Sequence, residues 1–125
     1  MKYYLSIGSN INPELNLELA ISALNKIFDQ IEYSSIHKTK AEGFDGDDFL
    51  NLVLCGISSI SFEGLNKKLK DIEDDAGRDR MAPKFSSRTL DIDIVLQLGE
   101  EEEILFESDQ ISKYRFVSEP LAELL

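Results

Sequence analysis

Hydrophobic and polar positions in the first third of the chain follow the period of a strand, then of a helix, then of a strand again. Positions 2–7 alternate between apolar and other side chains, which predicts a first strand. Asn12 and Pro13 are typical of a helix start, and apolar residues then recur at helical spacing to about Gln30. The segment 31–39 predicts a second strand.

The rest of the chain repeats this order of strand, helix and strand. The segment 48–57 is nearly all apolar, which predicts a central strand. Ser61 is placed to cap a helix with an apolar stripe, and Gly77 is placed to end it. The segment 90–98 predicts a fourth strand. The prediction is completed by polar loops at 40–48 and 78–89, a short strand at 104–106 and a helical turn at 120–125.

This order of elements is β-α-β-β-α-β within a single domain, residues 1–125. It predicts an α+β fold of the ferredoxin-like type, with an antiparallel-dominated sheet and helices packed mainly on one face. A chain of 125 residues can bury one core and is too short for two domains.

Net charge and the rare residue types argue against several classes of function. A formal charge of −11 argues against a general binder of nucleic acid or anionic membranes, because either needs a basic surface. Cys55 is the only cysteine and lies in an apolar run, so we expect a buried, inert thiol and no disulfide. His37 is the only histidine and has no evident serine or cysteine partner, so we expect it at the surface or at a strand end. No cleavable signal or membrane span is evident, and the cytoplasm is the expected location.

A cluster of basic residues directly precedes the fourth predicted strand. The segment 78–88 carries four basic residues against one acid, whereas the segment 100–109 carries six acids and no base. A basic island in an acidic protein indicates a local anion site and not a broad patch. The basic residues are Arg78, Arg80, Lys84 and Arg88.

Two aspartates follow this island at the start of the strand. Asp91 and Asp93 are two residues apart, so they share one face at about 6.5 Å along the strand, and Ile92 takes the other face. Mg²⁺ is held by one or two carboxylates plus substrate phosphates, and guanidinium groups bind phosphate oxygens bidentately. The combination predicts a metal-dependent polyphosphate site. The alternative is a solvated strand face, with Asp91 and Arg88 in a surface ion pair worth under about 1 kcal/mol.

Several motifs, taken in order, resemble one family from about Tyr3 to Leu121. They are Gly8-Ser9-Asn10, Phe49-Leu50-Asn51, Ile72-Glu73, Gly77-Arg78-x-Arg80, Arg88-Thr89-Leu90-Asp91-Ile92-Asp93-Ile94 and Phe116-Val117-x-x-Pro120-Leu121. The family is 6-hydroxymethyl-7,8-dihydropterin pyrophosphokinase, which transfers pyrophosphate from ATP to a pterin alcohol in folate biosynthesis. The Arg-Thr-Leu-Asp-x-Asp segment is its most specific motif. The resemblance also implies the family's βαββαβ fold, which agrees with the order of elements above.

The resemblance implies roles for individual residues. Asp91 and Asp93 would bind two Mg²⁺ ions that bridge ATP to the pterin alcohol, with Arg78 and Arg88 as further catalytic residues. The nucleotide site would comprise Glu73, Arg78, Arg80, Lys84 and Arg88. The pterin site would comprise Thr39, Phe49, Asn51 and Phe116, with the two phenyl rings on either side of the pterin. The partners would be ATP and the pterin, with no nucleic acid or membrane, and the protein would be a monomer.

Simpler roles stay open for some of these residues. Phe49 and Phe116 are equally compatible with an ordinary core position. Glu73 is equally compatible with a solvent-facing helical position, and Gly8-Ser9-Asn10 is expected to be a turn. Asn51 is harder to place in a core, because an amide buried without partners costs about 1–3 kcal/mol.

The sequence also departs from the family pattern on the nucleotide side. Lys84-Phe85-Ser86-Ser87 stands where the family has Arg-Trp-Gly-Pro, and the family's His-Pro is replaced around Ser108-Asp109. The family arginine two residues before Phe116 is Tyr114 here, with Arg115 beside it. A homologue that binds nucleotide or pterin with little or no turnover is therefore an alternative. A ferredoxin-like interaction module is a second alternative, but it leaves Asn51 and the basic loop unexplained.

Overall fold

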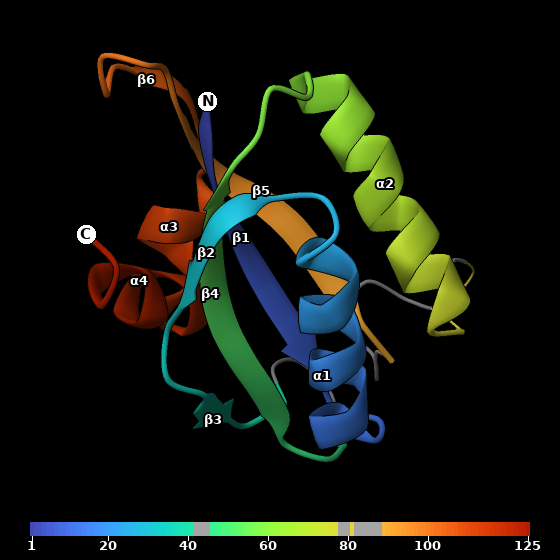
Figure 1. Cartoon of the computed structure of the whole chain (residues 1–125). Helices are drawn as coiled ribbons and strands as arrows, with labels where there is room; N and C mark the ends of the chain where they lie inside the picture. Colours follow the sequence, from blue (N-terminus) through green and yellow to red (C-terminus); the bar gives the residue numbers. More distant parts are fainter. Residues whose placement is uncertain (42–45, 78–80, 82–88) are drawn as a thin grey trace.

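The computed structural model describes residues 1–41, 46–77, 81 and 89–125. The elements in chain order are β1 (Lys2–Ser9), α1 (Pro13–Leu24), β2 (Asp29–Tyr33), β3 (His37–Thr39), β4 (Phe49–Ile57), α2 (Phe62–Asp75), β5 (Asp91–Leu98), β6 (Ile104–Glu107), α3 (Gln110–Lys113) and α4 (Arg115–Ala122). The described part of the chain follows the predicted βαββαβ order, with the second strand in two pieces and β6, α3 and α4 after it (Figure 1).

The strands form one sheet in the order β2-β4-β1-β5-β6, and β3 also pairs with β4. Each of these pairings is antiparallel, so the predicted α+β fold with an antiparallel-dominated sheet is confirmed. The central strand β1 is buried over seven of its eight residues. A strand buried on both faces must carry apolar or hydrogen-bonded side chains, and β1 pairs with β4 on one side and β5 on the other.

The two long helices, α1 and α2, cover one face of the sheet, as predicted (Figure 1). Their apolar stripes and the inward residues of β1, β4 and β5 form the main core, which includes Leu5, Ile7, Leu17, Leu24, Leu52, Leu54, Leu65, Leu69, Ile92 and Ile94. Ser61 caps α2 as predicted, because its Oγ accepts the backbone N–H of Gly64 at 3.1 Å. Gly77 follows the helix with a φ of 85°, a left-handed conformation that favours glycine.

The opposite face of the sheet carries a second, smaller core beneath α3 and α4 (Figure 1). Cys55 is buried there as predicted, and burial raises the pKa of its thiol. The sequence predicted only a helical turn at 120–125 in this region, and that prediction was too short. The predicted turn began at Pro120, but Pro120 lies inside α4, because Val117 and Leu121 are one turn apart and both are buried against the sheet.

Two element boundaries and one helix cap also differ from the prediction. The predicted strand 31–39 is broken at Ser34, whose side chain and backbone both hydrogen-bond the backbone of Val53. The first helix ends at Leu24 and not near Gln30, because the chain must turn before β2 begins. Asn12 precedes α1 in a left-handed conformation with a φ of 44°, and its side chain makes no capping hydrogen bond. In the part of the chain described, no helix is long and apolar enough to cross a membrane.

Candidate active site

Asp91 and Asp93 open β5 and share one face of the sheet, as the sequence predicted. Ile92 and Ile94 are buried in the core beneath α1 and α2, so the two aspartates project from the other face. Both side chains are half-buried. The pair therefore lies on the same face of the sheet as the second core, and it is partly accessible to solvent.

The central strand places a glycine between Asp91 and the predicted pterin residue Asn51. Gly8 of β1 pairs with Asp91 of β5 on one side and with Asn51 of β4 on the other. Directly opposed residues share a face, and adjacent strands lie about 4.8 Å apart, so the backbones of Asn51 and Asp91 are separated by about 10 Å. A Cβ atom on Gly8 would lie 2.8 Å from Asn51 Oδ1. Glycine at this position therefore leaves room for the side-chain amide of Asn51.

The Gly8-Ser9-Asn10 motif is more than the turn that the sequence predicted. Gly8 and Ser9 lie within β1, and Ser9 is fully buried with its Oγ 2.5 Å from the carbonyl oxygen of Thr89. The side-chain Nδ2 of Asn10 donates to the carbonyl oxygen of Asp47 at 3.0 Å. These two contacts hold the segments that lead into β5 and β4. The interpretation as turn chemistry alone was wrong, since it took the end of β1 two residues too early.

Asn51 has the partner that its burial requires. Its side chain is 4% exposed, and Nδ2 donates to the Oγ1 of Thr39 at 2.8 Å. Thr39 in turn pairs with Phe49 across β3 and β4. The structure therefore brings together three of the residues assigned to the pterin by resemblance.

A shallow cavity of about 380 Å³, largely open to solvent, lies between the end of β3 and the junction of α3 with α4. Its described lining is Thr39, Lys40, Ala41, Lys113, Tyr114, Arg115 and Phe116. The ring of Phe116 stacks on that of Tyr114, with centroids 4.8 Å apart and an interplanar angle of 21°. The volume of the cavity is within the range of small-molecule pockets. Of the residues predicted to bind pterin, Thr39 and Phe116 line the cavity, and Phe49 and Asn51 are not part of its described lining.

Glu73 is fully buried at the end of α2, so the solvent-facing alternative for it is wrong. Its Oε2 accepts the backbone N–H of Ile92 at 2.7 Å, and the Nζ of Lys70 lies 3.8 Å from its Oε1. Ile92 is the residue between the two aspartates. Glu73 therefore anchors the backbone between the two aspartates to α2.

Among the described residues, negatively charged side chains gather at this site. Burial raises the pKa of Asp93 to about 6, and the negative charges of Asp91 and Glu73 contribute to the shift. The ammonium group of Lys70 acts in the opposite direction. A divalent cation would relieve this repulsion, and a pair of carboxylates is a suitable protein share of a Mg²⁺ site whose remaining ligands are phosphates and water. Among the described residues there is no group of three or more His, Cys, Asp or Glu side chains placed to hold a metal. The carboxylate pair fits Mg²⁺ bound together with a nucleotide.

The predicted basic residues of the nucleotide side lie outside the described residues. These are Arg78, Arg80, Lys84 and Arg88. Their roles stay predictions from the sequence.

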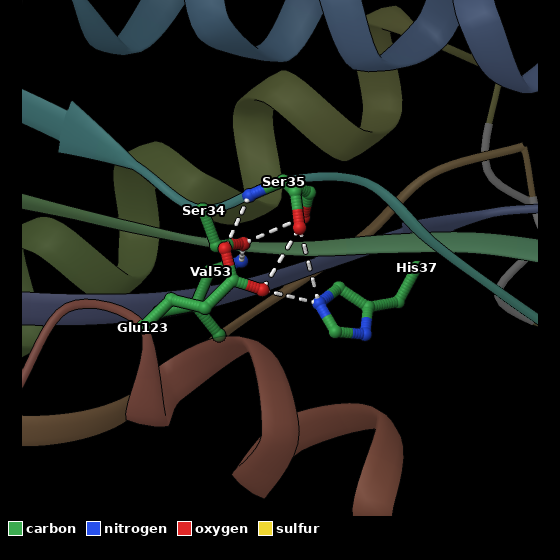
Figure 2. A network of polar contacts seen from close by, with 5 residues as sticks. All are labelled: Ser34, Ser35, His37, Val53 and Glu123. Carbon is green, nitrogen blue, oxygen red and sulfur yellow. Dashed lines mark hydrogen bonds and ion pairs between the residues drawn. The ribbon is translucent and has the colours of Figure 1, made fainter.

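His37 starts β3, and its place at a strand end is as predicted. The expectation that it has no serine nearby was wrong, because Ser35 Oγ lies 3.4 Å from His37 Nε2 (Figure 2). Glu123 contacts the same ring nitrogen at 2.5 Å. A hydrolytic triad needs serine and acid on different nitrogens of the imidazole, so this arrangement is not one.

Comparison with known proteins agrees with this geometry. The profile of the 7,8-dihydro-6-hydroxymethylpterin-pyrophosphokinase family matches residues 4–125. The chain belongs to this family. A curated relative, 2-amino-4-hydroxy-6-hydroxymethyldihydropteridine pyrophosphokinase of Aquifex aeolicus, is 34% identical over 99 residues, which cover 78% of this chain and 61% of that protein.

A second relative is the folate synthesis bifunctional protein of Chlamydia caviae, 32% identical over 131 residues. The match covers 96% of this chain and 29% of that protein. The chain thus spans less than two thirds of the length of either relative. The family match extends over residues 4–125, and the activity of the longer relatives is not assigned to this chain by the match.

Proposed function

We propose that this protein transfers pyrophosphate from Mg-ATP to the hydroxymethyl group of 6-hydroxymethyl-7,8-dihydropterin and releases AMP. The observation that carries the proposal is the row formed by Asn51, Gly8 and Asp91 across three strands. It sets a buried amide about 10 Å from a carboxylate pair on one face of the sheet. Membership of the pyrophosphokinase family supports the same reaction.

Asp91 and Asp93 would hold the magnesium, and we further propose that they hold two ions. Bound Mg²⁺ would supply positive charge to the phosphate oxygens. Asn51 would hydrogen-bond the pterin, and Phe116 would stack on its ring. Glu73 would keep the two carboxylates in place through the amide of Ile92.

The reaction balances without a covalent enzyme intermediate. The hydroxymethyl oxygen forms a bond to the β-phosphorus of ATP, and the bond from that phosphorus to the oxygen of the α-phosphate breaks. AMP leaves, and the hydroxyl proton passes to solvent. Transfer of this kind depends mainly on positioning and charge stabilisation, so a site without a nucleophilic cysteine or a serine–histidine pair is sufficient.

The second candidate is a family member that binds nucleotide or pterin with little turnover. It is favoured by Lys84-Phe85-Ser86-Ser87 in place of Arg-Trp-Gly-Pro, since lysine lacks the bidentate fork of arginine. Measuring AMP release from Mg-ATP, with and without the pterin alcohol, separates the two. Pterin-dependent AMP supports the transferase, and binding of both ligands without AMP supports the alternative.

A further inference from the structure

The end of α4 and the start of β3 are joined by a polar network that lies outside the family motifs (Figure 2). The Oε1 of Glu123 accepts the backbone N–H of Ser35 at 2.9 Å. Its Oε2 accepts the hydroxyl of Ser35 at 2.8 Å and contacts His37 Nε2 at 2.5 Å. Three groups of one segment therefore converge on one carboxylate, and we refer to Ser35, His37 and Glu123 as the clamp.

The neighbouring residue Ser34 fixes the other side of this segment. Its Oγ accepts the backbone N–H of Val53 at 3.0 Å, and its own N–H donates to the carbonyl oxygen of Val53 at 2.8 Å. The segment before β3 is thus attached to β4 by Ser34 and to α4 by the clamp (Figure 2). The backbone N–H of Ser35, followed by His37, lowers the pKa of Glu123 to about 2, which keeps its carboxylate ionised.

Helix α4 contacts strand β3, with the clamp at one end of this contact and the cavity at the other. Glu123 and Phe116 are seven residues apart, which is two helical turns, so they lie on the same side of the helix about 10 Å apart along its axis. His37 and Thr39 are two residues apart on β3 and share a face. Glu123 contacts His37 at one end, and Phe116 and Thr39 line the cavity at the other.

Besides the clamp, the described contacts of β3 are its pairing with β4, the hydrogen bond from Asn51 to Thr39 and the ion pair of Lys38 with Asp48 at 3.9 Å. The strand is three residues long and pairs with β4. A strand this short forms few ladder hydrogen bonds, so its distance from α4 depends on side-chain contacts. Thr39, the last residue of β3, is also the residue that accepts from Asn51.

We propose that Glu123 is a positioning residue for the pterin pocket, and that the clamp sets the separation of Phe116 and Thr39 across the cavity. The inference rests on the proposed function, because it assumes that this cavity takes the pterin. Glu123 is not part of the described lining of the cavity, so it would act through the placement of α4 against β3.

The test is the affinity of the protein for 6-hydroxymethylpterin, measured by calorimetry with the full chain. Glu123→Ala should raise the dissociation constant about five- to tenfold, while the KM for ATP and kcat at saturating pterin stay within about twofold. Glu119→Ala is the matched control, since Glu119 is an exposed acid on the same helix, and it should change neither constant. Glu123→Gln should retain most of the affinity, because its amide oxygen can still accept the backbone N–H of Ser35 and its amide N–H can donate to the Ser35 hydroxyl.

An unchanged pterin affinity in Glu123→Ala would overturn the inference. Equal rises in the constants for pterin and ATP, together with a lower melting temperature, would also overturn it, because they would indicate a general structural role. Failure of Glu123→Gln to retain affinity would do the same. The proposed function fails separately, if the unmodified protein shows no pterin-dependent release of AMP.

Discussion

The carboxylate of Glu73 accepts the backbone N–H of Ile92 at 2.7 Å, and this contact crosses from α2 to the strand that carries both aspartates. The side chain of Glu73 is fully buried, and the aspartates project from the other face of the sheet. A hydrogen bond to an ionised acceptor is about twice as strong as a neutral one. Glu73 therefore fixes the backbone of the segment that carries Asp91 and Asp93.

Replacing Glu73 with alanine should destabilise the fold and reduce activity together. The change leaves the N–H of Ile92 without its acceptor and opens a cavity, at a cost of about 1–3 kcal/mol in the free energy of unfolding. Glu73→Gln keeps an acceptor and should lose less. Urea denaturation measures the cost, and Asp71→Ala serves as a control because Asp71 is exposed on the same helix. A fully stable Glu73→Ala variant would show that the contact is dispensable.

Asp93→Asn should stabilise the metal-free protein above about pH 6 while abolishing turnover. The pKa of Asp93 is raised to about 6, above its usual range, so the native state binds this proton more tightly than the unfolded chain does. The resulting stability is present below about pH 4 and is lost as the pH rises to about 6. The asparagine variant does not lose this stability, which corresponds to on the order of 1–3 kcal/mol in the free energy of unfolding.

Denaturation at pH 4 and pH 7 without Mg²⁺ measures this difference. The variant should exceed the unmodified protein at pH 7 and show no such gain at pH 4. Added Mg²⁺ with ATP should stabilise only the unmodified protein. An equal gain at both pH values would mean that the charge of Asp93 is not its source.

Gly8→Ala should weaken pterin binding and leave ATP binding nearly unchanged. The added Cβ would lie 2.8 Å from Asn51 Oδ1, so the amide would have to move. Calorimetric titration with 6-hydroxymethylpterin measures the loss, expected at about 1 kcal/mol or more. In an Asn51→Ala background the same change should cost little, because the group that it displaces is gone. Additive losses from the two substitutions would show that Gly8→Ala does not act through Asn51.

Phe116→Ala should weaken pterin binding by about 1 kcal/mol or more, through lost stacking and apolar contact. ATP binding should barely change, since Phe116 lines the cavity beside Thr39, at the far end of the row from Asp91. Parallel titrations with each ligand distinguish the two effects. Equal losses for both ligands would place Phe116 in the structural core.

The sequence predicted the parts of this molecule that depend on local periodicity. The strand with Asp91 and Asp93 has alternating side chains, and the helix from Ser61 to Gly77 has both end signals, so these elements follow from short-range chemistry. The need of Asn51 for a partner also follows from its residue type alone. Its partner, Thr39, was assigned to the pterin site only through the family resemblance.

Contacts between distant segments could not be predicted in this way. Glu73 resembles any helical acid until α2 is packed on β5, and Glu123 meets Ser35 only when the second core is formed. Only the last part of helix α4 was predicted, because Pro120 is a start signal locally, whereas burial of its neighbours against the sheet decides where the helix begins. Tertiary packing overrode local propensity in that case.

The most direct test of the central claim is release of AMP from Mg-ATP in the presence and absence of 6-hydroxymethyl-7,8-dihydropterin. The unmodified protein should release AMP only with both the pterin and Mg²⁺, and Asp91→Ala and Asp93→Ala should each release none while keeping their fold by circular dichroism. Near-normal AMP release in either aspartate variant, or none from the unmodified protein at saturating substrates, would contradict the claim.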